Sequence, residues 1–149
     1  MKNIETVPAS INLHELISRL ISSYQTLAEN QKSFFINDVP TGLSLVADQE
    51  VLSTLLGSLF YIVARSSKNN SIHICATAYG DRVLISVSDS SPSGTYGVFY
   101  EFQHLRLLSQ SLNGFLKIET YHNRETTITY NFQNRSPHCL KVVNELKIA

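Results

Sequence analysis

The sequence predicts an α+β two-layer sandwich, in which three helices cover one face of a mixed, mostly antiparallel sheet. Two observations support this fold class. Three long segments repeat apolar residues at helical spacing, and the segments between them alternate apolar with polar residues as strands do. One strand pair is joined at Gly80-Asp81, a turn typical of a tight hairpin. A chain of 149 residues is expected to form a single domain, 1–149.

Composition narrows the function classes. The chain carries 12 basic and 12 acidic residues without a basic patch, so no nucleic-acid partner is expected. No apolar run reaches about 18 residues, so no membrane insertion is expected. The first residues lack the apolar stretch of a signal peptide, which favours a cytoplasmic location. Cys75 and Cys139 have no C-x-x-C spacing and are interpreted as thiols in a reduced compartment.

The N-terminal segments predict a short edge strand and then a helix. The strand is expected over 4–7, with Pro8 ending it, and the helix over 12–30. Asn12 followed by Glu15 resembles a capping box at the helix start. The apolar stripe of this helix is Leu13, Leu16, Ile17, Leu20, Ile21, Tyr24 and Leu27.

A second helix is expected over 48–67, after strands at 33–39 and 43–47 that a turn at 40–42 separates. Asp48 is suited to accept from the first free amides, and Glu50 adds negative charge near the positive end of the helix dipole. Its apolar stripe is Val51, Leu52, Leu55, Leu56, Leu59, Phe60, Ile62 and Val63.

The C-terminal part predicts four more strands and a third helix. The strands are expected over 71–79, 82–89, 115–121 and 125–133, and the helix over 99–112. Asn113-Gly114 is expected to cap that helix in the left-handed conformation. Ser136-Pro137 is typical of a further helix start, with proline in the first turn.

The second helix resembles the N box of the histidine-kinase-like ATPase superfamily, whose sensor kinases read roughly D-x-x-x-L-x-x-x-L-x-N-L-x-x-N-A-x-K. The matching positions are Asp48, Leu52, Leu59 and Arg65. The two asparagines are replaced by Ser58 and Ile62. In the family the second asparagine coordinates the magnesium that bridges the ATP phosphates. The resemblance therefore implies a Bergerat-type ATP-binding sandwich with degraded N-box chemistry.

The glycine boxes of that family are also altered. The G1 box, D-x-G-x-G, reads Asp89-Ser90-Ser91-Pro92-Ser93, which keeps the adenine-binding aspartate and loses both glycines. Only the nine residues 90–98 remain for the ATP lid, and 99–102 occupies the second glycine box. Residues 90–98 are expected to form a plain connecting loop.

The closing strand resembles the family's G-T-T-F-x-F-x-L. Thr127 aligns with the threonine near adenine, Glu125 replaces the glycine, and Thr127 also fits as an ordinary strand residue. The resemblance places the core of the domain at about 11–133 and leaves a tail of 134–149. Vestigial nucleotide-binding residues on the adenine side are expected to be Asp89 and Thr127.

The histidines predict no metal centre, because none has the spacing of a ligand pair. His14-Glu15-Leu16 resembles the phospho-acceptor box of sensor kinases only superficially, since Ile17-Ser18-Arg19 follows it. His14 is therefore expected to be an exposed helix residue.

The leading hypothesis is a degenerate, non-catalytic histidine-kinase ATPase-like domain that binds proteins in two-component-type signalling. Its partner would be a phosphotransfer protein, a response regulator or a second copy, and no cofactor or metal is expected. The alternative is a shortened nucleotide-binding domain with residual ATP-magnesium binding or kinase activity, served by Glu50, Arg65 and Lys68. A structural piece of a larger assembly is a third hypothesis.

Overall fold

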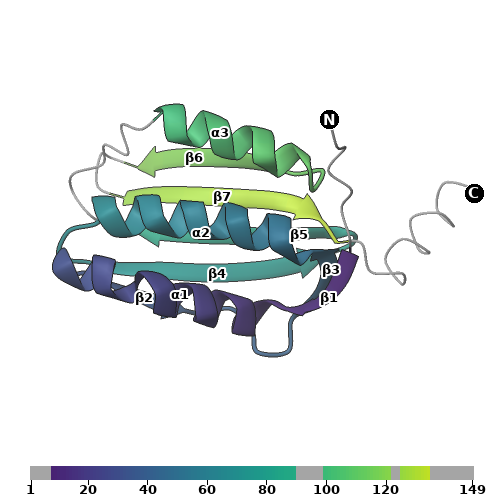
Figure 1. The fold of residues 1–149 in the computed structure, drawn as a ribbon, viewed down its shortest axis with the longest axis horizontal. Coiled ribbons are helices and arrows are strands. Elements are labelled where there is room, and N and C mark those ends of the chain that lie inside the picture. Colours follow the sequence, from purple (N-terminus) through teal and green to yellow (C-terminus); the bar gives the residue numbers. More distant parts are fainter. Residues whose placement is uncertain (1–7, 90–98, 122–124, 135–149) are drawn as a thin grey trace, which may run out of the picture.

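The protein folds into two layers, with three helices on one face of a five-stranded sheet (Figure 1). A computed structural model describes residues 8–89, 99–121 and 125–134. The sheet has the strand order β2-β4-β5-β7-β6. β2 pairs with β4 in parallel and the other neighbours pair antiparallel, so the sheet is mixed and mostly antiparallel, as predicted.

The element boundaries lie close to those expected from the sequence. The helices are α1 (Leu13–Asn30), α2 (Gln49–Ser66) and α3 (Phe99–Gln110). The strands are β1 (Pro8–Asn12), β2 (Phe34–Asn37), β3 (Ser44–Asp48), β4 (Ser71–Tyr79), β5 (Arg82–Asp89), β6 (Phe115–Tyr121) and β7 (Glu125–Gln133). The expected strand at 4–7, the loop 90–98, the turn 122–124 and the helix from Ser136 lie outside the described residues.

The two long helices begin where the sequence places a capping side chain. Asn12 Oδ1 accepts from the amide of Glu15 at 3.2 Å, and Asp48 Oδ1 accepts from the amide of Val51 at 3.0 Å. Each bond satisfies one of the amides that a helix start leaves without an intrahelical partner. The caps therefore fix where α1 and α2 start above the sheet.

The core lies between the helices and the inner face of the sheet, and α2 supplies most of the helical contribution. Nine residues of α2 are buried: Leu52, Leu55, Leu56, Gly57, Leu59, Phe60, Ile62, Val63 and Ala64. Phe60 meets Phe35 of β2 at a ring-centroid distance of 5.5 Å, and Tyr130 stacks on Phe132 of β7 at 5.0 Å. These aromatic contacts join α2 to the edge strand and fill the centre of the sheet.

The N-terminal strand differs from the prediction. Pro8 begins β1 instead of ending a strand, because β1 pairs antiparallel with β3 from Pro8 opposite Asp48 to Asn12 opposite Ser44. A proline fits the first residue of a strand on an open edge, where its missing amide breaks no ladder bond. β1 and β3 form a separate two-stranded sheet.

The described chain ends at Asn134, which holds the small sheet to the large one. Its side-chain oxygen accepts from the amide of Val46 in β3 at 2.9 Å, and its own amide donates to the carbonyl of Asp81 at 2.7 Å. Asn134 is buried. Asn134, the last described residue of the chain, is therefore joined to both sheets.

The end of α3 is closed by the predicted left-handed residue, which is Asn113 with φ of 52°. Gly114 serves a different need. A Cβ placed on it would lie 2.4 Å from the carbonyl oxygen of Asn131, so only glycine allows β6 to start this close to β7.

Candidate functional site

A buried chain of polar side chains lies where the C-terminal end of α2 meets the end of β5. The Ser67 hydroxyl donates to Asp89 Oδ1 at 3.1 Å, and the Oγ atoms of Ser33 and Ser67 are 2.9 Å apart. The amide of Asn70 donates to Ser33 Oγ at 3.3 Å. Because Ser67 donates to Asp89, Ser33 donates to Ser67. The hydrogen bonds thus run in one direction and end on the Asp89 carboxyl group.

Asp89 is only 2% exposed, and Ser67 is fully buried. Burying a carboxylate is unfavourable unless hydrogen bonds replace its water. Ser67 closes α2 as its C-cap residue, and its amide donates to Val63 O at 2.8 Å. The helix end and the buried aspartate are therefore linked through one serine side chain.

The inward-facing threonine opposite Asp89 is Thr126. The two residues are paired across β5 and β7, Thr126 is 2% exposed, and its hydroxyl has no hydrogen-bond partner among the described residues. An unpaired buried hydroxyl costs about 1–3 kcal/mol of stability. A polar group that sits unpaired beside a buried carboxyl group is a typical contact for a polar ligand.

Thr127, expected with Asp89 on the adenine side, lies on the opposite face of the sheet from Asp89. Its register partner is Ser88, and the two hydroxyl oxygens are 3.4 Å apart on the face away from the helices. Successive strand residues point to opposite faces. Asp89 and Thr127 are therefore not brought together, and Thr126 shares the face of Asp89.

Ile62, at the second N-box position, is 3% exposed and belongs to the buried face of α2. Ser58, at the first, is partly exposed. A side chain without oxygen or nitrogen gives no ligand to magnesium, which prefers oxygen. The structure thus places hydrocarbon in the core at this position.

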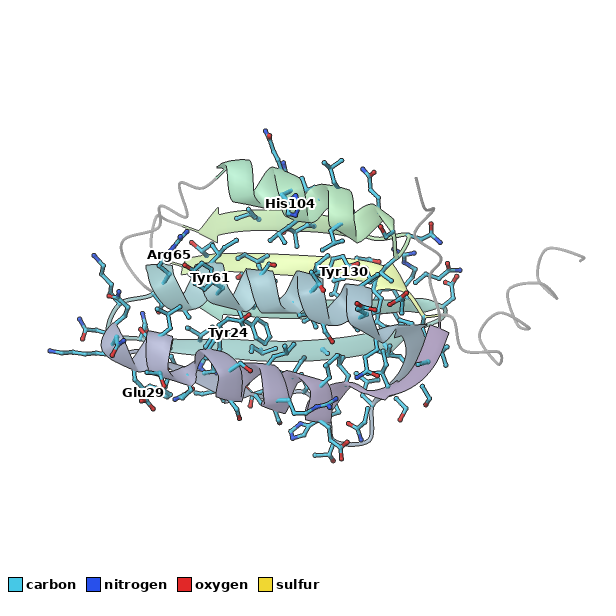
Figure 2. All side chains as sticks on the ribbon, viewed as in Figure 1. Tyr24, Glu29, Tyr61, Arg65, His104 and Tyr130 are labelled. Carbon is cyan, nitrogen blue, oxygen red and sulfur yellow. The ribbon has the colours of Figure 1, made fainter. Side chains whose placement is uncertain are left out.

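Two of the three charges considered for a rebuilt phosphate site, Glu50 and Arg65, lie far apart. Glu50 and Arg65 are 15 residues apart on α2, which is about 22 Å along the helix axis. The Arg65 guanidinium lies over the Tyr61 ring at 5.2 Å from its centroid, and Tyr61 meets Tyr24 of α1 edge to face at 6.4 Å (Figure 2). Arg65 therefore contributes to a stacked group of side chains on the helical layer.

His14 is half-buried, not exposed as expected. Its Nδ1 lies 2.7 Å from the carbonyl oxygen of Val39, which holds the loop after β2 against α1. His73 Nδ1 contacts Asp38 Oδ2 at 3.1 Å on the surface. Among the residues that the structure describes, no three His, Cys, Asp or Glu side chains gather as metal ligands.

No protein-family model and no curated protein matches the sequence. Solved structures do match. The histidine kinase AdeS of Acinetobacter baumannii superimposes with a TM-score of 0.77 at 10% identity, over 89% of this chain and 70% of AdeS. The catalytic domain of histidine kinase ThkA, free of nucleotide, gives 0.68 at 15% identity, over 86% of this chain and 96% of that domain.

The chain has the histidine-kinase-like ATPase fold. Full-length ShkA, solved with AMPPNP, shares this fold with a TM-score of 0.74 at 18% identity. The match covers 88% of this chain and 32% of ShkA, so the chain spans about a third of ShkA. In the described part of this histidine-kinase-like chain, no helix has the length and apolar character to cross a membrane.

Sequence reasoning missed three polar residues of this histidine-kinase-like fold: Ser33, Ser67 and Thr126. Ser33 and Ser67 are common residues at element ends, and nothing in their spacing predicts that they meet. Thr126 carried a usable signal, because alternation from the buried Ile128 places it on the inner face.

Proposed function

We propose that this chain is a kinase-like domain of two-component-type signalling that has lost ATP chemistry and binds proteins in the cytoplasm. Residues 1–149 act as one domain. Its partner is a phosphotransfer protein, a response regulator or a second copy of the chain. The proposal includes no bound cofactor and no metal. The observation that carries it is the burial of Ile62 in the core at the N-box position.

Phosphoryl transfer depends on positioning and on neutralising phosphate charge, usually through magnesium and backbone amides. Ile62 offers no metal ligand, and Glu50 and Arg65 stand too far apart to share a phosphate site. The sequence also has no glycine at the G1 positions. These features together favour a chain that does not hold a triphosphate.

The hydrogen bonding of Asp89 supports the same conclusion. In the family this aspartate binds the amino group of adenine. Here Ser67 donates to it, and Ser33 supports Ser67 from the start of β2. A serine hydroxyl thus supplies a hydrogen bond that a nucleotide would otherwise make.

Isothermal titration with ATP, once with magnesium and once with EDTA, tests the loss of nucleotide binding. We expect dissociation constants of about 1 mM or higher under both conditions. The binding free energy is then no more favourable than about −4 kcal/mol. ShkA, whose structure contains AMPPNP, is titrated in parallel as the positive control. A micromolar constant that EDTA abolishes would overturn the proposal.

The unpaired hydroxyl of Thr126 favours a second candidate function, the weak binding of a base ring without its phosphates. Adenosine lacks the phosphate groups and isolates this contact. If the site binds only the base ring, adenosine and ATP bind with equal affinity, and magnesium does not change the affinity for ATP. NMR titration of the amides near Asp89 and Thr126 with adenosine measures it.

A further inference from the structure

The sheet face away from the helices, here called the outer face, has an unusual composition at its centre. Its central residues come from β4, β5 and β7 and include Leu84 and the six small residues Cys75, Thr77, Ser86, Ser88, Thr127 and Thr129. Cys75, Ser86 and Thr129 stand side by side across the three strands. None of the six is charged, whereas a solvated sheet face commonly presents lysine and glutamate.

The charges around this centre are mostly engaged within the face. Lys117 and Glu119 of β6 form an ion pair at 3.1 Å. The Arg82 Nε donates to the side-chain oxygen of Asn131 at 2.7 Å. His73 contacts Asp38 at 3.1 Å. Asn131 is neutral, so Arg82 keeps its charge, and the exposed Glu125 of β7 carries the opposite one. The face therefore carries positive and negative charges in nearly equal number.

Large aromatic side chains stand exposed around the same face. Phe34 of β2 is 49% exposed, Tyr79 of β4 is 52% exposed and Phe115 of β6 is 58% exposed. All three point away from the helices, because their register partners Ser71, Arg82 and Asn131 belong to the outward-facing set. Aromatic residues are enriched in protein interfaces relative to the rest of a protein surface.

We propose that two copies of the chain pack back to back through their outer faces. Two sheets pack well at a separation of about 10 Å when their facing side chains are small and interdigitate. Serine and threonine meet this requirement and lose little side-chain entropy on packing. The occupant is a second copy because a face whose positive and negative charges nearly balance can complement itself, and it offers little charge contrast to an acidic or basic partner.

The area of the face is sufficient for such a dimer. Five strands at about 4.8 Å spacing and about eight residues in length give roughly 600 Å² per copy. Specific interfaces bury about 600–1,000 Å² per partner. This estimate treats the face as flat, and the exposed aromatic side chains at its rim add to the area.

The inference is independent of the proposed loss of ATP chemistry, since Ile62 and Asp89 lie on the helical side of the sheet and the outer face lies on the other side. A dimer that binds ATP would refute the proposed function alone, and a monomer that does not bind ATP would refute the dimer alone. The inference selects self-association among the partners considered above.

Sedimentation equilibrium of the full chain at about 1–100 µM tests the dimer. We expect a mass twice that of the 16.7 kDa chain at the upper concentrations. Ser86→Glu adds a charge at the centre of the face and is expected to weaken the dimer at least about tenfold. Thr54→Glu adds the same charge to the exposed side of α2 and is expected to leave the dimer unchanged.

Cys75 gives a second readout that needs no substitution in the face. In a Cys139→Ser background, Cys75 is the single thiol, and its reaction with a thiol reagent is expected to accelerate on dilution as the dimer separates. Burial and the nearby Asp38 charge raise the pKa of Cys75, so the rates are compared at one pH. A monomer at 100 µM, or a Cys75 rate that does not depend on concentration, would refute the back-to-back dimer.

Discussion

At the residue scale, the hydroxyl group of Thr126 makes this side chain a candidate ligand contact and not only a packing residue. It is buried, it faces the same side as Asp89, and no described group bonds to it. Valine has nearly the same shape without the oxygen. The cost of the unpaired group should therefore disappear when valine replaces threonine.

We predict that Thr126→Val raises the free energy of unfolding by about 1 kcal/mol, because it removes an unsatisfied buried hydroxyl. Urea titration measures the change. Thr127→Val, on the partly exposed outer face, is the control and should change stability by less than about 0.5 kcal/mol. A loss of stability in Thr126→Val would show that this hydroxyl has a partner, such as ordered water.

Tyr130 is a second residue whose chemistry is set by its surroundings. Burial raises the pKa of its hydroxyl well above the ordinary value, and the charge of Arg82 partly opposes this. The hydroxyl donates to the Ser109 carbonyl at 3.4 Å, a long hydrogen bond. Ionised tyrosine is therefore excluded from this part of the core.

The raised pKa predicts a loss of stability at alkaline pH. The contribution of Tyr130 is fully present below the unfolded-state pKa of about 10 and is lost as the pH rises from there toward the folded-state value. We expect Tyr130→Phe to flatten the fall in urea midpoint between about pH 9 and pH 11. At pH 7 it should cost no more than about 1 kcal/mol. Equal slopes for the two proteins would contradict this assignment.

At the element scale, α2 starts at a capping contact that the sequence predicted, from the amide of Val51 to Asp48. We expect Asp48→Ala to lower the free energy of unfolding by about 1–2 kcal/mol, because Val51 N loses its acceptor. Asn12→Ala tests the same contact at α1, where the bond is longer, and should cost less. Thermal melting with circular dichroism compares them. A neutral Asp48→Ala would mean that packing alone places α2.

Most elements could be predicted from the sequence, because their signals are local. Alternation and a tight turn defined β4 and β5, which match the expected ranges residue for residue. Pairing between distant strands has no such signal. The separate β1–β3 sheet depends on contacts about 35 residues apart, and Pro8 reads locally as a strand end.

The candidate site was predictable only in part, for the same reason. Asp89 stood out because it closes a clear strand pattern. Its donor Ser67 follows α2, and Ser33, which bonds to Ser67, precedes β2, so only the fold brings these residues together. Thr127 was chosen by likeness to a motif, and the alternation of β7 selects Thr126 instead. His14 looked exposed because the loop residue Val39 that covers it is 25 positions away.

At the scale of the whole molecule, the two sides of the sheet have separate tasks. The inner side holds the helices, the core and the buried Asp89 (Figure 1). The outer side carries hydroxyl groups and rim aromatics. Because a sheet of this size separates them, a substitution on one side should not change binding on the other, and the nucleotide and sedimentation experiments report independently.

The strand β3 fastens both ends of the described chain: Pro8 pairs with Asp48, and Asn134 holds Val46. The first and last described residues, Pro8 and Asn134, are therefore held by the same short strand. Force applied between Pro8 and Asn134 would act first on the β1–β3 pairing and on the bond from Val46 to Asn134. The five-stranded sheet would stretch only after these contacts broke.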